Sequence, residues 1–210
     1  MVKTLLEKAN EAESRFGINP RRDGVCRLDL AEVFDNHNPV ALEIGSGKGR
    51  FLVEAGRENP AINYVGVEKS LRYYRHVLRR LASWDVRNAR IVNYDAAVVV
   101  EEMLASQSIA EIHIYFPDPW PRSKHHKRRI VREDVLQNFA RILEPSGHGV
   151  YVTDHAEYFE AAVPEFREYF EVMVGEVSGV SPRTNYEAKY RKEGRPIYEV
   201  RFSGARYRGR

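Results

Sequence analysis

Short apolar runs alternate with helix-like segments from residue 40 onward, and this alternation constrains the fold more strongly than any other feature of the sequence. The runs are rich in β-branched residues and lie at 40–44, 62–67, 89–92, 112–116 and 149–152. The segments between them have helical period and lie near 49–58, 70–84, 97–105, 129–143 and 155–169. Repeated strand and helix units of this length predict right-handed crossovers and a mostly parallel sheet, and therefore an α/β fold.

The two ends of the chain depart from this alternation. Residues 3–13 are expected to form a short helix, followed by an irregular segment with turn signals at 14–23. Near the other end, 170–177 and 197–202 are predicted to form a closing pair of strands, with a polar stretch at 178–196 between them.

The helix predicted at 70–84 has the clearest pattern. Its apolar residues gather on one face, and its other face carries Arg72, Arg75, Arg79 and Arg80.

Positive charge is concentrated in two places along the chain. The 210 residues carry 33 Lys and Arg against 30 Asp and Glu, which gives a net charge of +3. Between Asp118 and Glu133 there is no acidic residue, yet this segment holds six Lys or Arg and two adjacent histidines. Four more arginines, and no acidic residue, follow Glu199. The remainder of the chain is acidic, so a polyanionic partner would bind locally.

Composition also bounds the class of protein. The single cysteine, Cys26, excludes an internal disulfide and a cysteine-based metal site within this chain. No apolar stretch approaches the ~18 residues of a membrane span, and the charged start is unlike a signal peptide. We therefore expect a cytoplasmic protein with no metal and no membrane partner. Its length predicts one domain at 35–210, preceded by a helix and extension at 1–34.

A glycine-rich turn, Glu43-Ile-Gly45-Ser-Gly47-Lys-Gly49, follows the first apolar run. Glycines let the backbone turn tightly and approach a ligand closely. The spacing differs from the dinucleotide-binding G-x-G-x-x-G, because Arg50 stands where the third glycine would be. A pyrophosphate requires positive surroundings, whereas Glu43 would tolerate a ligand with sulfonium and ammonium groups. S-adenosylmethionine carries both, so the turn favours methyl transfer over hydride transfer.

Acidic residues follow the next two runs as well. Glu68 ends the second run, nineteen residues after Gly49, where a carboxylate can accept two hydroxyl groups of a ribose. Asp95 follows the third run and is expected within reach of an adenine amino group. Taken singly, each acid could equally be a surface carboxylate or a helix cap. Acids after three successive strands together indicate a nucleoside-binding edge of the sheet.

Prolines at 117, 119 and 121 make a stiff loop directly after the fourth run. This loop presents Asp118 and Trp120 at the tip of a strand. Amino-directed methyltransferases use a similarly placed turn to hold a base by its edge and to stack on its face. The basic run that follows is predicted to hold RNA phosphates. Its predicted RNA-binding residues are Lys124, His125, His126, Lys127, Arg128 and Arg129.

The ordered set of motifs resembles the bacterial tRNA (guanine-N7)-methyltransferase family. Its most specific element is Phe116-Pro-Asp-Pro-Trp-Pro-Arg-Ser-Lys-His-His-Lys-Arg-Arg129. The resemblance extends over about 35–210 and includes shorter motifs at 34–39, 43–49, 66–68, 153–158, 184–187 and 194–198.

The resemblance implies a Rossmann-like class I methyltransferase fold, with a mostly parallel seven-stranded sheet, helices on both faces and a C-terminal antiparallel strand pair. It implies that S-adenosylmethionine is the cofactor and that the methyl group goes to N7 of the variable-loop guanine of tRNA. Asp118 is implied to be catalytic. The implied cofactor contacts are Glu43, Gly45, Gly47, Gly49, Glu68, Asp95 and Asp118. The implied contacts to the target are Arg122, Asp154, Thr184, Asn185, Tyr186 and Glu187.

Guanine N7 has an in-plane lone pair and no proton, so its methylation needs no general base. The protein must supply geometry, a pocket without water and carboxylates that favour the cationic product. We expect Glu187 or Asp154 to accept hydrogen bonds from guanine, and Asp118 to position cofactor and target together.

Three alternatives stay open at this stage. They are a methyltransferase of the same fold acting on another RNA site, a non-catalytic RNA-binding module and a nicotinamide dehydrogenase. The sequence also leaves open whether the protein is a monomer or a homodimer.

Overall fold

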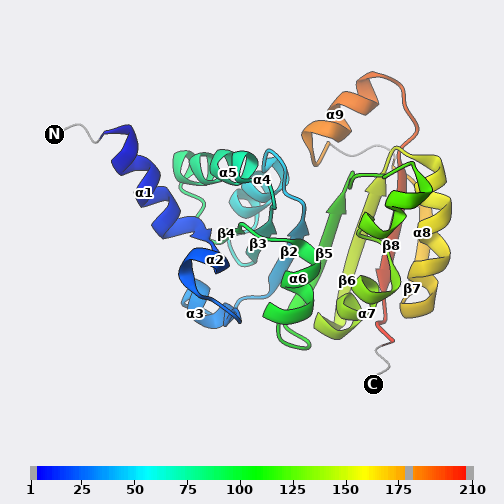
Figure 1. Cartoon of the computed structure of the whole chain (residues 1–210), viewed down its shortest axis with the longest axis horizontal. Helices are drawn as coiled ribbons and strands as arrows, with labels where there is room; N and C mark the ends of the chain where they lie inside the picture. Colours follow the sequence, from blue (N-terminus) through cyan, green and yellow to red (C-terminus); the bar gives the residue numbers. More distant parts are fainter. Residues whose placement is uncertain (1–3, 178–181, 207–210) are drawn as a thin grey trace. The chain divides into compact units, whose positions relative to one another are not determined.

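A computed structural model describes residues 4–177 and 182–206 of the chain (Figure 1). The chain divides into two compact units, 1–103 and 104–210, and each is considered by itself.

The first unit contains four parallel strands in the order β1, β4, β3, β2. These strands are β1 (Gly17–Ile18), β2 (Val40–Ile44), β3 (Asn63–Val67) and β4 (Ala89–Val92). Every residue of β2 and β3 is buried, which explains why both read as continuous apolar runs rather than as alternating patterns. Because the strands are parallel, their carboxyl ends lie along one edge, where the glycine turn, Glu68 and Asp95 follow.

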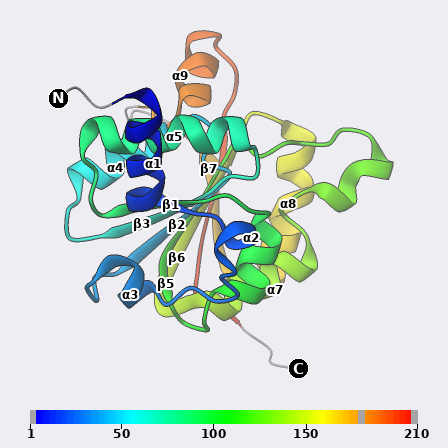
Figure 2. The same ribbon diagram turned by 60° about the vertical axis from the view of Figure 1, so that its left-hand side comes forward.

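Helices connect these strands in the expected order. They are α1 (Leu5–Phe16), α2 (Pro20–Asp23), α3 (Leu30–Phe34), α4 (Arg50–Glu58), α5 (Leu71–Trp84) and the short α6 (Ala96–Val98), which continues into the π-helix η1 (Val99–Met103). α1 begins with a capping box between Thr4 and Glu7. It packs on α5 (Figure 2). Its residues Ala12 and Phe16 belong to the buried cluster that includes Tyr74.

The second unit has four strands in the order β5, β6, β8, β7. β5 (Ile109–Tyr115) and β6 (Leu143–Thr153) are parallel, whereas β8 (Tyr198–Ser203) runs antiparallel to both β6 and β7 (Glu171–Glu176). The helices of this unit are the 3₁₀-helix η2 (Ser123–Arg128), α7 (Glu133–Ile142), α8 (Ala156–Tyr169) and α9 (Asn185–Lys192).

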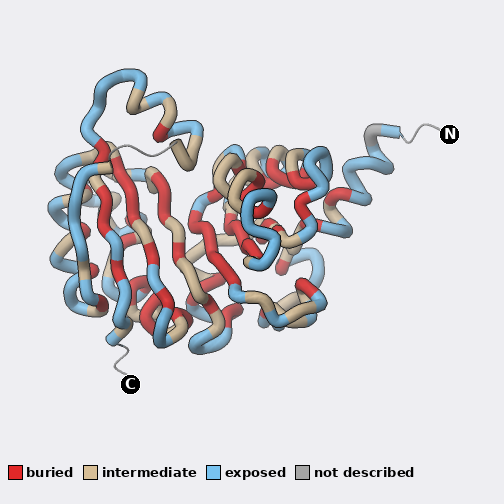
Figure 3. The backbone as a smooth tube through the Cα atoms, turned by 180° about the vertical axis from the view of Figure 1, so that it is seen from behind, coloured by how far each residue is buried: buried red, intermediate tan, exposed pale blue. Residues whose placement is uncertain are grey.

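Buried aromatic rings fill the space between α8 and its strands. Phe166 stacks on Phe202 at 4.8 Å between ring centroids, and Tyr151 and Phe170 complete the cluster. In Figure 3 most strands are drawn largely as buried, whereas β7 is mostly exposed and α9 has exposed and intermediate positions with one buried residue.

The α/β alternation and the closing antiparallel pair are therefore confirmed. The described residues hold eight strands rather than seven, because Gly17–Ile18 pairs with β4 inside the segment that was expected to be irregular. The helix expected at 97–105 is a short α-helix followed by a π-helix, and α3 was not anticipated. α9 lies in the polar stretch 178–196, of which 178–181 lie outside the described residues. A domain boundary at residue 34 stays a prediction.

No helix in the described part of the chain combines the length and the apolar character needed to cross a bilayer.

Candidate active site

The glycine turn between β2 and α4 has its N–H groups turned toward acidic and carbonyl oxygens. The N–H groups of Gly45 and Ser46 both donate to the Val67 carbonyl, at 2.9 and 3.1 Å. Gly49 has a φ of 65° and caps α4, and any side chain there would meet Val77 of α5. Gly45 has a φ of 75° and open space where a side chain would begin. Glycine is thus required at this position for backbone conformation, and the space in front of it stays open.

Glu43 is a buried acid directly before this turn, with 3% of its surface exposed. Its Oε2 atom has no hydrogen-bond partner among the described residues. The pKa of Glu43 is raised to about 7, mainly by burial; the Ser46 side chain opposes this rise and the charge of Glu68 adds to it. An unpartnered buried carboxylate of this kind is expected to bind a cation or a hydrogen-bond donor.

Glu68 joins the ends of β2 and β3. Its Oε2 accepts the Gly47 N–H at 2.8 Å, and its Oε1 accepts the Ser70 N–H at 2.7 Å. These bonds fix the carboxylate beside the glycine turn, and its contact with a ribose diol stays a prediction.

Asp95 follows β4, and its carboxylate makes two contacts within the protein. Its Oδ1 caps α6 by accepting the Ala97 N–H at 3.0 Å, and its Oδ2 pairs with Lys69 at 2.8 Å. An amino group of a ligand could share Oδ2 or displace the exposed Lys69, so the predicted adenine contact stays a prediction.

The first unit therefore presents two acids at one turn. A pyrophosphate would meet the carboxylates of Glu43 and Glu68, which oppose its charge, whereas a ligand with an ammonium group and a ribose finds an acceptor for each. The orphaned Glu43 oxygen and the open space before Gly45 fit S-adenosylmethionine better than a dinucleotide.

The proline loop of the second unit is bent by two strained residues. Phe116, with a φ of 50°, and Trp120, with a φ of 43°, adopt the left-handed region, which bulky residues rarely occupy. They flank Pro117-Asp118-Pro119 and leave Asp118 exposed. Backbone strain of this kind collects at ligand-binding sites. Arg128 lies 4.9 Å over the Trp120 ring, and the His125 ring meets Trp120 edge-on.

The basic loop forms a 3₁₀-helix with its charges outward. Lys124, Lys127 and Arg128 are exposed, as is Arg122 before them, and none takes part in an ion pair with the described residues. His125 and His126 are half-buried, and His126 Nε2 has no partner among the described residues.

Arg129 is buried, unlike the other Lys and Arg residues of the basic run. The residue is 6% exposed, it donates from Nε to the Pro119 carbonyl at 2.8 Å, and its guanidinium lies 4.7 Å over Tyr158 of α8. Arg129 therefore anchors the basic loop to the proline loop. The guanidinium also pairs with Glu157 at 3.5 Å, which leaves little of its charge for a phosphate, and its RNA contact stays a prediction.

Asp154, Tyr186 and their neighbours form a partly open aromatic corner. Asp154 follows β6 and accepts from Arg195 at 3.1 Å, and Arg195 lies 4.7 Å over Tyr190. The Tyr190 ring contacts Phe116 edge-on at 5.4 Å, and Tyr186 is 49% exposed beside them. Thr184 caps α9 by accepting the Glu187 N–H at 3.1 Å, and Asn185 is exposed at the start of that helix.

Glu187 lies at the centre of a buried ion-pair network and has no exposed surface. Its Oε2 accepts two bonds from Arg183 and its Oε1 accepts one from Arg191 at 2.6 Å. Arg183 continues to Glu199 of β8 at 2.8 Å. This network holds α9 to the sheet of its unit, and sequence reasoning missed Arg183 and Glu199 because the network forms only on folding.

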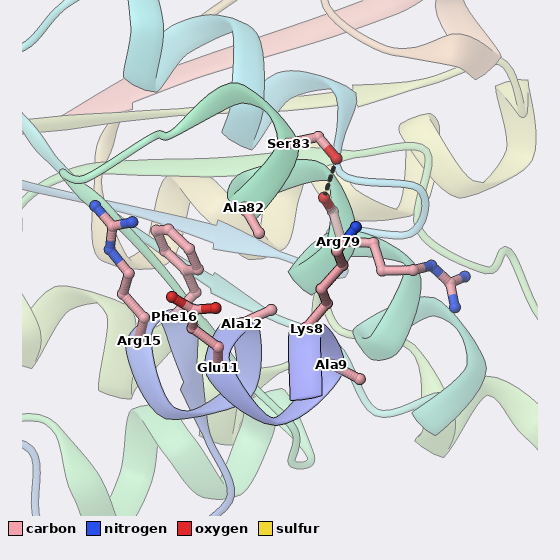
Figure 4. Close-up of a pocket in the computed structure, with 9 residues that line it drawn as sticks. All are labelled: Lys8, Ala9, Glu11, Ala12, Arg15, Phe16, Arg79, Ala82 and Ser83. Carbon is pink, nitrogen blue, oxygen red and sulfur yellow. Dashed lines mark hydrogen bonds between the residues drawn. The ribbon is translucent and has the colours of Figure 1, made fainter. Parts of the chain in front are cut away.

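A cavity of about 430 Å³ lies between α1 and α5, and no residue predicted to bind cofactor or substrate lines it (Figure 4). The described residues also contain no group of three or more His, Cys, Asp or Glu that could hold a metal ion.

Two solved structures have the same fold. A 30S ribosomal A1408 methyltransferase from an uncultured bacterium has a TM-score of 0.58 and 17% identity, covering 84% of this chain and 92% of that one. A precorrin-6y C5,15-methyltransferase from Geobacter metallireducens has a TM-score of 0.58 and 16% identity, covering 86% and 94%. These likenesses show the Rossmann-like fold of class I methyltransferases.

Sequence comparison gives the family. Residues 37–200 match the family described as "Putative methyltransferase". A tRNA (guanine-N(7)-)-methyltransferase of Francisella tularensis subsp. novicida is 36% identical over 182 residues, covering 84% of this chain and 79% of the relative. The enzyme of that name from Listeria welshimeri is 36% identical over 177 residues, covering 80% and 82%. The chain belongs to the family of tRNA (guanine-N7)-methyltransferases.

Proposed function

We propose that this protein is an enzyme that transfers the methyl group of S-adenosylmethionine to N7 of the variable-loop guanine of tRNA. The observation that carries the proposal is the buried, unpartnered carboxylate of Glu43 beside the open glycine turn, in a chain of this family. The tRNA substrate is that of the relatives, and the cofactor is inferred from the fold and the two acids.

Three parts of the first unit would hold the cofactor. Glu43 accepts the ammonium group and becomes ionised in doing so, Glu68 accepts the ribose hydroxyls, and Gly45 leaves room for close approach. The cofactor supplies a methyl group on a positively charged sulfur. Asp95 is the proposed acceptor for the adenine amino group.

The second unit would hold the nucleotide. Asp154 accepts from the N1–H and 2-amino groups of guanine, exchanging part of its bond to Arg195. The exposed ring of Tyr186 provides a face on which a base can stack. Glu187 acts as a positioning residue, since both of its oxygens already accept from arginine. Arg122, Thr184 and Asn185 stay predicted contacts to the target.

The reaction needs no proton acceptor at its centre. The N7 lone pair forms the new bond to the methyl carbon as the carbon–sulfur bond breaks. The electron pair of the broken carbon–sulfur bond goes to sulfur. The guanine ring gains a positive charge, which nearby carboxylates stabilise. Asp118 is the proposed catalytic residue, because its exposed carboxylate is held on the strained proline loop. Alignment and exclusion of water supply most of the acceleration.

Cations without acidic partners would bind the tRNA backbone. The basic loop exposes Arg122, Lys124, Lys127 and Arg128. Arg129 anchors this loop by its hydrogen bond to the Pro119 carbonyl. Their charge contributes affinity and orientation, whereas the identity of the nucleotide is read elsewhere.

The proposal is tested with unmodified tRNA and methyl-labelled cofactor, followed by digestion to nucleosides. Label in 7-methylguanosine is expected. Label in another nucleoside indicates another RNA site, and binding without transfer indicates an RNA-binding module. An Asp118→Ala variant serves as the inactive control.

A further inference from the structure

The arginine face of α5 has no part in the function proposed so far. Arg72, Arg75 and Arg79 are exposed on this face, and Arg80 is half-buried beside them. α5 contains four arginines and no acidic residue. Residues 1–103 hold 16 Lys and Arg against 15 Asp and Glu, so without these four arginines the unit has a net charge of −3.

These arginines differ from others of the same unit in lacking acidic partners. Arg15 and Arg87 both pair with Asp85, at 2.7 and 2.9 Å, and Arg50 pairs with Glu54 at 2.9 Å. In the part of the chain that the structure describes, no ion pair involves an arginine of α5. Their charges therefore stay unneutralised at the surface.

The positions of the charges on α5 also destabilise the helix. Its first turn has no acid and carries Arg72, and its last turn has no base, which is the reverse of what the helix dipole favours. Arg72 with Arg75, and Arg75 with Arg79, are like charges at spacings of three and four residues, which repel each other. By contrast, α9 has Glu187 in its first turn and three bases in its last. Helix stability does not explain this face.

The positive region continues onto the glycine turn. Arg80 donates to the Lys48 carbonyl at 2.9 Å. Burial lowers the pKa of His76, and the charges of Arg79, Arg80 and Lys48 lower it further, with no acid acting in the opposite direction. Three cationic groups, Arg79, Arg80 and Lys48, thus surround a half-buried histidine.

A phosphate chain fits this surface better than a folded protein partner does. Apart from Leu71 and Trp84 at the ends of α5, its fully exposed side chains are the three arginines, Ala82 and Ser83. Protein interfaces depend on a buried apolar or aromatic anchor, which is missing from the middle of this face. Arg72 and Arg79 leave the backbone of α5 about 10 Å apart along the helix axis. Their side chains can therefore contact more than one phosphate of an extended chain. Guanidinium groups match phosphate oxygens in pairs.

We infer that Arg72, Arg75 and Arg79 of α5 bind backbone phosphates of the tRNA at nucleotides other than the target. The inference rests on the proposed function for the identity of the polyanion. It adds a second phosphate-binding surface, on the first unit, to the basic loop of the second.

The test measures binding of unmodified tRNA by fluorescence anisotropy over a range of salt concentrations. The variant is Arg75→Gln/Arg79→Gln, in which neither side chain makes a bond that folding needs. Each lost phosphate contact reduces the salt slope by about 0.7–0.9, which at 0.15 M salt is a factor of about four to five in affinity. The double variant should therefore lose a slope of about 1.4–1.8 and bind about 15- to 30-fold more weakly.

The matched control is Arg15→Gln/Arg87→Gln, which removes the same charge from the same unit at positions paired with Asp85. It should keep the wild-type slope, as should the charge-preserving Arg75→Lys/Arg79→Lys. Thermal unfolding and cofactor calorimetry check that all variants are folded. Equal slopes for the Gln double variant and the control overturn the inference. If the wild type binds tRNA but forms no 7-methylguanosine, the proposed function fails. The salt slopes of the variants still show whether the α5 arginines contact phosphates.

Discussion

Replacing Glu43 by Gln should stabilise the cofactor-free protein increasingly as pH rises from 4.5 to 7. Burial raises the pKa of Glu43 from its ordinary 4.5 to about 7. Between these values the native state keeps a proton that the unfolded state has already lost. Stability contributed by this group therefore falls as pH rises through that range, and above pH 7 the full cost of a buried charge is present. Gln has similar shape and does not ionise, so the cost disappears.

The size of the effect follows from the two pKa values. A difference between 4.5 and about 7 corresponds to about 3 kcal/mol. Little discount for solvent is needed, because the side chain is 3% exposed and Oε2 has no partner among the described residues. This is a large fraction of the stability of an ordinary domain.

Urea unfolding of wild type and Glu43→Gln between pH 4.5 and 8 measures the difference directly. The gap in unfolding free energy should widen by about 3 kcal/mol up to pH 7 and then stay constant. Other titrating groups cancel in the comparison, since both proteins share them. A gap that is independent of pH would refute the reasoning.

The same substitution connects stability to the cofactor. A bound ammonium group favours the ionised form of Glu43, so cofactor binding just below pH 7 should release protons from the wild type. Calorimetry in buffers of different ionisation enthalpy detects this release. Glu43→Gln should bind the cofactor more weakly and release none through this group, and equal release by both proteins would show that Glu43 does not meet the ligand.

Three further substitutions test the remaining parts of the site. Glu68→Ala should weaken cofactor binding by about 10- to 100-fold in calorimetry, because a charged acceptor is lost. Asp118→Ala should abolish methyl transfer with an unchanged melting temperature, since the side chain is exposed; near-normal turnover would remove its catalytic role. Glu187→Ala should leave two arginines without their buried partner and cost about 3–5 kcal/mol of local stability, seen as faster hydrogen exchange in α9. Unchanged exchange there would contradict the anchoring role.

Local patterns of the chain predicted much of the fold. The apolar runs at 40–44 and 89–92 coincide with β2 and β4. β2 is buried throughout and β4 is buried at every position but Arg90, so both strands are marked by apolar residues on both faces. The arginine face of α5 was equally visible from its period. β1 could not be predicted, since two residues carry no period and pair only through tertiary contact with β4.

The candidate site was predictable where function depends on strand tips and less so where it depends on tertiary partners. Glu43 lies near the end of β2, Glu68 directly follows β3, and both lie beside the glycine turn. Nothing in the sequence distinguishes Arg129 from its neighbours in the basic run, yet only Arg129 is buried and bonded to Pro119. Glu187 likewise reads as a free acid until Arg183 and Arg191 are seen to surround it.

The central claim is that N7 of the variable-loop guanine is the nucleophile. It is tested by replacing that guanosine in tRNA with 7-deazaguanosine, which has carbon in place of N7 and keeps the N1–H and 2-amino groups. The account predicts that this tRNA binds as tightly as the unmodified one and accepts no labelled methyl group. Methylation of the 7-deaza tRNA at the normal rate would contradict it.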